Sequence, residues 1–117
     1  MKIFIADDSR IDSLALQSIV EENNNEAVCV ENGQELLELI NSSSSYPDLI
    51  LLDIMMPKLD GFEVCKILKS NDLTKQIPII FLTSKISVED EIKGLQFGAV
   101  DFIRKPFHDK IVQARLD

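Results

Sequence analysis

Five short apolar runs alternate with five stretches of helical periodicity, and this alternation limits the fold more than any other feature of the chain. The runs occupy residues 2–6, 26–30, 48–53, 77–83 and 100–105. Three of them are continuously apolar, as strands covered on both faces of a sheet must be. We therefore predict a doubly wound α/β domain with a five-stranded parallel sheet, five helices and right-handed crossovers.

The segments between these runs carry apolar residues at helical spacing, and each apolar stripe is expected to face the sheet. In chain order the stripes are Ile11, Ala15, Leu16, Ile19 and Val20; Leu36, Leu37 and Ile40; Phe62, Cys65 and Leu68; and Val88, Ile92 and Leu95, with a fifth helix expected from His108. Asn32, with Glu35 three residues later, is typical of a helix N-terminus. The polar tracts 23–25 and 41–47 indicate loops.

Size and charge exclude several classes of protein. A chain of 117 residues, 45% hydrophobic and 27% charged, is long enough to bury one core and shows no internal domain boundary. The net charge of −8 disfavours direct binding of nucleic acid and favours a divalent cation or a basic partner. The longest apolar run, Leu49 to Leu52, is too short to cross a bilayer, and the start leaves no room for a signal peptide. We therefore expect a cytoplasmic location and no membrane association.

Several residues with reactive side chains are interpreted as structural. Cys29 and Cys65 lie in apolar patterns without CxxC spacing, which predicts two buried, reduced thiols. Met55 and Met56 are expected to pack in the interior. His108 is expected to lie on the surface where the last helix starts.

Polar side chains gather where the predicted strands end, and in open α/β sheets ligands bind at that edge. The residues are Asp7 and Asp8 after the first run, Asp53 at the end of the third, Thr83 and Ser84 after the fourth, and Lys105 and Pro106 after the fifth. Asp7 or Asp8, with Ser9, can alternatively serve only to cap the first helix. Lys105 can neutralise only one of the three carboxylates. The remaining negative charge favours binding of a hard divalent cation. Oxygen ligands without His or Cys nearby favour Mg²⁺. Such a site suits phosphoryl chemistry.

The motifs at these strand ends resemble a known family. Asp7 and Asp8, Asp53 within "LLDIMMPKLDG", Thr83, and "KPF" at residues 105–107 look like the receiver domain of two-component response regulators, and are similar to the chemotaxis response regulators. The resemblance runs from Lys2 into the last helix. It implies a flavodoxin-like fold with strand order 2-1-3-4-5.

The resemblance also implies a role for each site residue. Asp53 would accept a phosphoryl group from the phosphohistidine of a sensor histidine kinase or phosphotransfer protein. Asp8, Asp53 and the backbone carbonyl of Met55 would bind Mg²⁺ directly, and Asp7 would do so through water. Lys105 would pair with Asp53 and then with a phosphoryl oxygen. The domain would be a regulatory phosphoacceptor that catalyses its own phosphotransfer and dephosphorylation.

The family also implies a conformational switch. Thr83 would be the switch hydroxyl and Phe102 the aromatic switch residue, although Phe102 lacks the hydroxyl of the more frequent Tyr. Phosphorylation would change the surface formed by the fourth helix, fifth strand and fifth helix, and thereby an output domain, a partner protein or a phosphorylation-dependent dimer. Met55 and Lys85 occupy positions that tune the lifetime of the phosphate in the family. The bond between Lys105 and Pro106 resembles the family's cis peptide.

Competing functions fit the sequence less well. A phosphatase of the haloacid dehalogenase kind needs a second acid two residues after its nucleophile, where this chain has Met55. A flavin-binding module needs a Ser-, Thr- or Gly-rich phosphate loop after the first strand, where this chain has "DDSR". An inactive receiver-like interaction domain remains the alternative. The last helix has no Gly or Pro stop, which leaves open that residues 1–117 are the N-terminal receiver domain of a longer chain.

Overall fold

The fold was analysed in a computed structural model that describes residues 1–57, 59–84 and 87–116. Strands and helices alternate in the order β1 (Lys2–Ala6), α1 (Arg10–Glu22), β2 (Glu26–Val30), α2 (Gly33–Ser42), β3 (Leu49–Asp53), α3 (Gly61–Lys69), β4 (Ile79–Thr83), α4 (Val88–Gln96), β5 (Asp101–Arg104) and α5 (Asp109–Leu116). The strands pair in parallel in the order β2-β1-β3-β4-β5. The predicted doubly wound fold is therefore confirmed, although β3, β4 and β5 begin one or two residues later than predicted.

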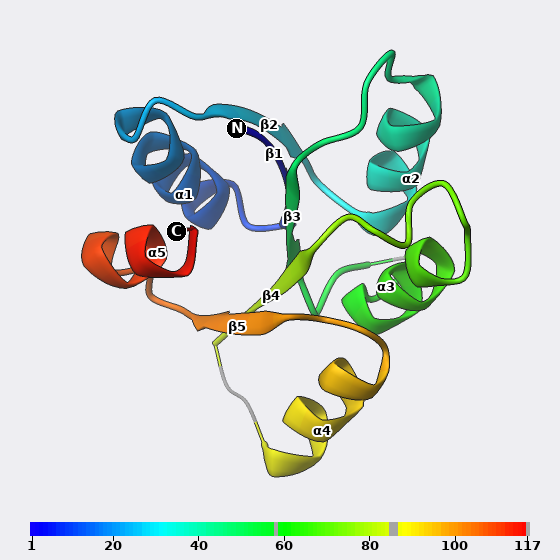
Figure 1. Ribbon diagram of the computed structural model, residues 1–117. Helices are drawn as coiled ribbons and strands as arrows, with labels where there is room; N and C mark the ends of the chain where they lie inside the picture. Colours follow the sequence, from blue (N-terminus) through cyan, green and yellow to red (C-terminus); the bar gives the residue numbers. More distant parts are fainter. Residues whose placement is uncertain (58, 85–86, 117) are drawn as a thin grey trace.

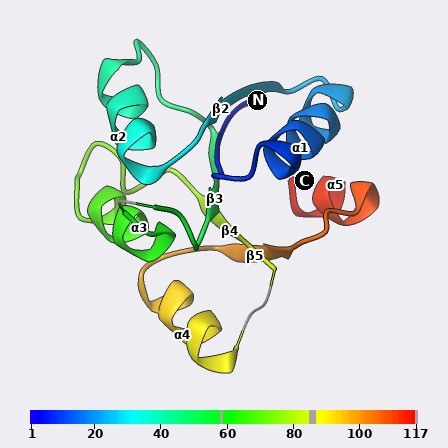
Figure 2. The ribbon, with the colours of Figure 1, turned by 180° about the vertical axis from the view of Figure 1, so that it is seen from behind.

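The helices form two layers around the sheet. Helices α1 and α5 cover one face, and α2, α3 and α4 cover the other, as opposite views show (Figures 1 and 2). Neighbouring residues of β1 contribute to different cores: Ile5 packs with Leu16 and Val112 on the first face, and Phe4 packs with Leu36 on the second. This alternation follows from strand geometry, in which successive side chains point to opposite faces.

The central strands are buried and the edge strands are not, and this difference corrects one prediction. All five residues of β3 and of β4 are buried, whereas β2, at the edge of the sheet, is only partly covered. Cys29 of β2 is therefore exposed, contrary to the predicted burial, while Cys65 of α3 is buried as predicted. Both cysteines are free thiols.

Two helices orient their apolar residues differently from the prediction. In α1, Leu16, Ile19 and Val20 are buried as expected, but Ile11 is 82% exposed and Ala15 is also exposed. In α4 the predicted helix is present, but Val88, Ile92 and Leu95, which were expected to face the sheet, are 73%, 50% and 51% exposed. A helical period indicates that an apolar stripe exists, but it does not indicate that another element covers it.

Helix α4 is held through a glycine instead. Gly94 is the only buried residue of this helix, and a Cβ atom added there would lie 2.6 Å from Cζ of Phe102 and 3.1 Å from the ring of Phe81. The backbone of α4 thus packs directly on two aromatic rings. A side chain at this position would push the helix away from the sheet.

Local signals fix the remaining boundaries. The side chains of Ser9, Asn32, Asp60 and Ser87 each cap a helix by accepting a hydrogen bond from a backbone N–H three residues later. This confirms the predicted start at Asn32 and satisfies a donor that the helix itself leaves free. Asn24, in the first polar tract, has a φ of 64°, in the left-handed region. Within the described part of the chain, we find no helix with the length and apolar character needed to cross a membrane.

Candidate functional site

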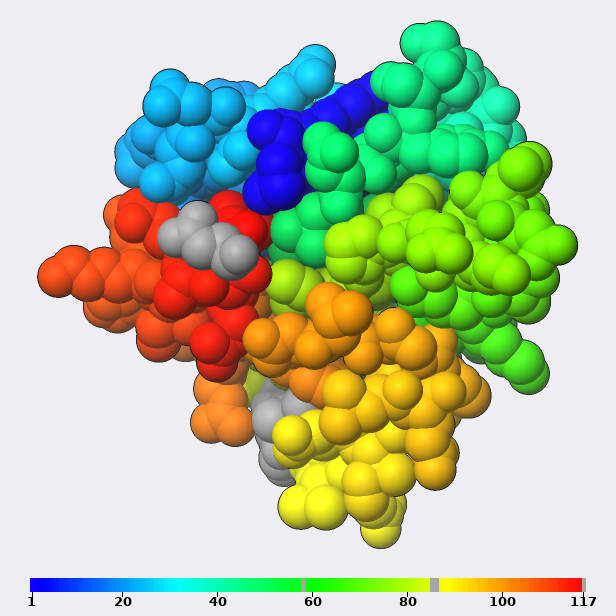
Figure 3. Space-filling view, viewed as in Figure 1, coloured from blue at the N-terminus to red at the C-terminus, as the bar shows by residue number. Residues whose placement is uncertain are grey.

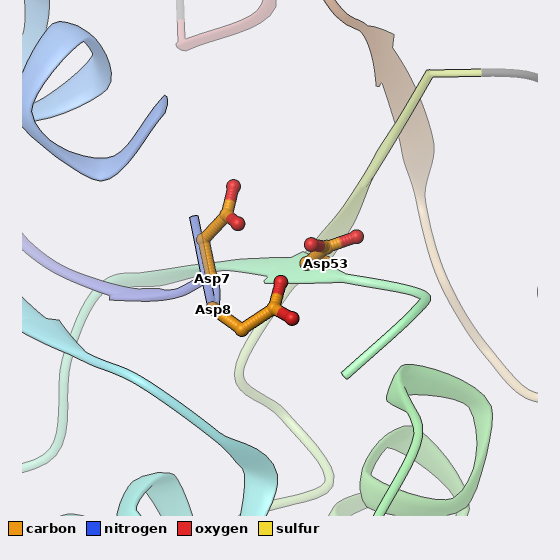
Figure 4. A group of neighbouring side chains, drawn as sticks. All are labelled: Asp7, Asp8 and Asp53. Carbon is orange, nitrogen blue, oxygen red and sulfur yellow. The ribbon is translucent and has the colours of Figure 1, made fainter. Parts of the chain in front are cut away.

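Three acids meet at the carboxyl edge of the central strands. Asp7 and Asp8 directly follow β1, and Asp53 is the last residue of β3 (Figure 4). One carboxylate oxygen from each of the three residues lies within 4.8 Å of the other two. Asp7 and Asp53 are buried, with 2% and 5% of their surface exposed, and Asp8 is exposed. The structure thus brings together the acids that were predicted from the strand ends.

Backbone donors hold the two buried carboxylates in place. Asp53 Oδ1 accepts a hydrogen bond of 3.2 Å from the N–H of Met55, and Asp7 Oδ1 accepts one of 2.9 Å from the N–H of Ser9. Ser9, and neither acid, caps α1, since its hydroxyl oxygen accepts from the N–H of Asp12. The alternative that Asp7 or Asp8 serves only as a helix cap is therefore wrong.

Lys105 reaches into the cluster from the segment after β5. Its peptide bond to Pro106 is cis, as the resemblance implied, and its N–H donates to the carbonyl of Thr83 at 2.7 Å. Its Nζ lies 3.2 Å from Oδ2 of Asp53 and donates a hydrogen bond to it. The predicted pairing of Lys105 with Asp53 is present.

Lys105 also contacts two further acids. Its Nζ lies 2.9 Å from Oδ2 of Asp7 and 3.0 Å from Oδ2 of Asp12, which is in the first turn of α1. Asp12 was not predicted as part of the site. The only sequence signal is its place one helical turn after Asp8, and an acid in the first turn of a helix is ordinary.

Mutual repulsion and burial change the protonation of this site. Burial and the neighbouring Asp7 raise the pKa of Asp53 from 3.8 to about 7, although Lys105 opposes the change. Burial lowers the pKa of Lys105, but its contacts with Asp7 and Asp12 outweigh this effect and leave the pKa raised. Three acids in contact with one ammonium, with Asp8 beside them, leave an excess of negative charge that a cation would offset.

The residues present fit a hard divalent cation. Oδ2 of Asp7 is buried and makes no directed hydrogen bond with the described residues, because its approach to Lys105 Nζ at 2.9 Å is an ion pair without hydrogen-bond geometry. A buried oxygen in that state can serve a ligand. Together with Asp8 and Asp53 it forms an all-oxygen donor set, which Mg²⁺ prefers over softer ligands.

An open cleft leads to Asp53. Its walls include the other predicted residues of the site, Thr83, which is buried, and Ser84, which is exposed. Met55 lines the cleft with a side chain 80% exposed, so its predicted packing role is wrong, whereas Met56 is buried as predicted. Three further residues that line the cleft were not predicted: Ser87, which caps α4, Asp90 in its first turn and Lys93 in its last turn.

The two remaining predicted residues lie elsewhere. The ring of Phe102 packs on Phe81, with centroids 5.6 Å apart, on the α4 side of the sheet, and it does not line the cleft. Lys85, expected to tune the lifetime of the phosphate, lies outside the described residues.

Comparisons with known proteins identify the family of this chain. The family model for the response regulator receiver domain matches residues 3–117. The alkaline phosphatase synthesis transcriptional regulatory protein PhoP of Bacillus subtilis is 39% identical over 98% of this chain and 46% of its own length, so the chain spans about half of that relative. The structure of the chemotaxis protein CheY4 of Vibrio cholerae is 27% identical, with a TM-score of 0.91 over 98% of this chain and 94% of that one. The Mn²⁺-bound form of the response regulator Rcp1 is also 27% identical, with a TM-score of 0.86 over 97% of this chain and 89% of that one. A family match over almost the whole length, on a fold with the predicted strand order, shows that this chain belongs to the response regulator receiver domains of two-component signal transduction.

Proposed function

We propose that Asp53 is the phosphoacceptor of this receiver domain. A carboxylate oxygen of Asp53 attacks the phosphorus of a phosphohistidine on a sensor histidine kinase or phosphotransfer protein. The P–N bond breaks, its electron pair stays on the imidazole nitrogen, and a new O–P bond makes an acyl phosphate. The observation that carries this proposal is the position of Asp53, which ends the central strand β3 in an open cleft with Lys105 Nζ 3.2 Å away.

The neighbouring residues would prepare this reaction. Lys105 stabilises negative charge on the phosphoryl oxygens, because its ammonium already lies at the attacking carboxylate. Asp8, Asp53 and the backbone carbonyl of Met55 would hold Mg²⁺, with Asp7 contributing through water. When bound, this ion would offset the charge of the carboxylates and of the incoming phosphoryl group. The Mn²⁺-bound form of the similar regulator Rcp1 supports a divalent cation here.

Hydrolysis of the acyl phosphate on Asp53 would take place in the same cleft. Water that reaches the acyl phosphate on Asp53 returns the domain to its resting state, with phosphate as the product. The exposed side chain of Met55 stands on the wall of the cleft, where it limits the approach of water. The domain is thus a regulatory phosphoacceptor that catalyses its own phosphotransfer and dephosphorylation.

Phosphorylation would be transmitted through Thr83 and Phe102. Thr83 lines the cleft beside Asp53. Phe81 lies two residues before Thr83 in β4, and it pairs with Phe102 of the neighbouring strand β5. When the Thr83 hydroxyl moves to the phosphoryl group, the Phe102 ring gains room to rotate. A change of this kind shifts an existing equilibrium between two packings, and a dianion at Asp53 supplies the bias.

The output surface would be formed by α4, β5 and α5. It carries exposed apolar side chains, and Arg115 Nε and Asp101 Oδ2 form an ion pair on it at 3.1 Å. The exposed apolar residues are Val88, Ile92, Leu95, Val100 and Ile111. Figure 3 shows that the α4 and β5 segments, in yellow and orange, adjoin on one face. Its partner would be an output domain, another protein or, on phosphorylation, a second copy of the domain; we propose no direct contact with nucleic acid and a cytoplasmic location.

Intact mass spectrometry tests the proposal. The domain is incubated with a small acyl-phosphate donor, with and without Mg²⁺, beside an Asp53→Asn variant and an Asp72→Asn control whose side chain is 91% exposed. We expect one Mg²⁺-dependent phosphoryl group on the wild type and the control, and none on Asp53→Asn. If neither the donor nor a cognate kinase phosphorylates the wild type, the domain is an inactive interaction module.

A further inference from the structure

The ammonium of Lys105 is shared among three carboxylates. Its Nζ lies 2.9 Å from Asp7, 3.0 Å from Asp12 and 3.2 Å from Asp53. The ammonium carries a single positive charge, so a closer approach to one acid leaves less attraction for the others. The contact with Asp53 is a hydrogen bond, yet it is the longest of the three. Asp12 therefore competes with the proposed phosphoacceptor for the same positive charge.

The position of Asp12 is set by the fold. Its backbone N–H donates to the capping hydroxyl of Ser9, in the first turn of α1. This helix is anchored on the sheet by four buried residues, Ser13, Leu16, Ile19 and Val20. The Asp12 side chain is 32% exposed and that of Lys105 only 13%, so the ammonium has little freedom to leave the acids around it.

We propose that Asp12 is a positioning residue that holds the Lys105 ammonium back from Asp53. The proposal rests on the phosphoacceptor role of Asp53 and adds a residue that this role does not require. Asp12 has two effects of opposite sign. It favours binding of a cation by the acids, and it slows gain of the phosphoryl group.

The effect on cation binding follows from competition for the carboxylates. Lys105 and a divalent cation both offset the charge of Asp7 and Asp53. By drawing the ammonium toward α1, Asp12 leaves these two acids more available to the cation, and its own negative charge adds to the attraction. Without the charge of Asp12, the ammonium would settle on Asp7 and Asp53 and oppose the cation.

The effect on phosphotransfer follows from the charge that develops in the reaction. The phosphoryl oxygens need Lys105, and Asp12 withholds part of that ammonium. The negative charge of Asp12 also repels an anionic phosphodonor. Both terms slow the step in which the Asp53 oxygen attacks phosphorus and, with acetyl phosphate as donor, acetate leaves with the electron pair of the broken P–O bond.

The test is an Asp12→Asn variant measured in two ways. Isothermal titration calorimetry gives the affinity for Mg²⁺ without any phosphodonor, and intact mass over time gives the rate of phosphorylation by acetyl phosphate at saturating Mg²⁺. An ion pair with one partly exposed partner affects each quantity modestly, so we expect binding of Mg²⁺ about two- to fivefold weaker and phosphorylation about two- to fivefold faster. A folding defect would instead lower both.

Two further variants separate positioning from charge. Asp90→Asn removes an acid that lines the cleft of Asp53 and Lys105 but is not among the described contacts of Lys105. It is expected to change the Mg²⁺ affinity and the phosphorylation rate less than Asp12→Asn does. Asp12→Glu keeps the charge and is expected to stay closer to wild type. Three outcomes would overturn the positioning role. Asp12→Asn and Asp90→Asn could have equal effects, Asp12→Asn could leave the Mg²⁺ affinity unchanged, or it could change the Mg²⁺ affinity and the phosphorylation rate in the same direction. If the wild type takes no phosphoryl group, the phosphoacceptor proposal fails, and the Mg²⁺ affinities alone decide for or against Asp12.

Discussion

Replacing Asp53 by Asn is expected to stabilise the folded domain at alkaline pH when no divalent cation is present. Burial and Asp7 raise the pKa of Asp53 to about 7 in the folded state, from an ordinary 3.8. The charged form of this carboxyl group is therefore less favourable in the folded state than in the unfolded state. At alkaline pH the folded protein nevertheless carries this charge, which lowers its stability. Asn removes that charge and keeps a side chain of nearly the same size. Lys105 keeps its contacts with Asp7 and Asp12.

The magnitude follows from the difference between the two pKa values. Taken in full, the change from 3.8 to about 7 corresponds to an upper limit of about 4 kcal/mol. Because the cleft admits water, which screens the repulsion, we expect a gain of about 1 to 2 kcal/mol in the free energy of unfolding. The folded state binds this proton more tightly than the unfolded state does. The penalty in the wild type is therefore absent below about pH 4, grows as the pH rises and is complete above about pH 7.

Urea denaturation in a buffer with a chelator measures this gain. The unfolding free energies of wild type and Asp53→Asn are compared at pH 8 and pH 5, with Asp72→Asn as the matched control on the surface. We expect the advantage of Asp53→Asn to be largest at pH 8 and to shrink strongly at pH 5, while the control stays near wild type at both. An Asp53→Asn variant that is no more stable than wild type at pH 8, or equally favoured at both pH values, would refute this reasoning.

Three further predictions concern the site and the core. Mg²⁺ at a hundred times its dissociation constant should stabilise the wild type by about 2.7 kcal/mol in thermal or urea unfolding, and a chelator should abolish the gain; equal stabilisation of a variant with Asp8 and Asp53 both changed to Asn would place the ion elsewhere. Gly61→Ala should cost about 2 kcal/mol or more in urea unfolding and slow phosphorylation, because the new Cβ would collide with the backbone carbonyl of Asp53; a variant as stable and as fast as wild type would contradict the close approach. Leu51→Ala should cost about 2 to 5 kcal/mol, since this side chain is fully buried in the central strand β3, and a loss below about 1 kcal/mol would show that the core closes over the cavity.

The parts of the site that lie at strand ends were predictable from the sequence. An apolar run that stops at an acid is recognisable without a structure, and parallel strands bring such ends to one edge. For this reason Asp7, Asp8, Asp53, Thr83 and Lys105 were all predicted, together with the strand order that the family resemblance implied. Asp12 was missed because an acid in the first turn of a helix is favourable by itself, and its contact with Lys105 depends on how α1 sits on the sheet.

Errors in the predicted burial have a common origin. Cys29 lies in an apolar run, but the run forms an edge strand, and nothing in the run indicates its place in the sheet. Ile92 lies in a regular stripe on α4, yet the helix turns that stripe to the surface. Met55 follows a buried strand by two residues, where the chain has already left the core. In each case the pattern was read correctly as apolar, and tertiary placement decided its exposure.

The packing of α4 through Gly94 has a consequence for how much free energy a rearrangement of this helix requires. Helix α1 would have to expose four buried side chains in order to move, whereas α4 would expose the backbone at one glycine, the two rings beneath it and the Phe62 ring under Lys93. Local opening is least costly where few apolar contacts are broken. We therefore expect the amide hydrogens of α4 to exchange with solvent through a sub-global opening well below the free energy of complete unfolding, and those of α1 only near that limit. If Asp53 is phosphorylated as proposed, a modest change in free energy there would therefore be enough to redistribute α4 between positions while the rest of the domain stays in place.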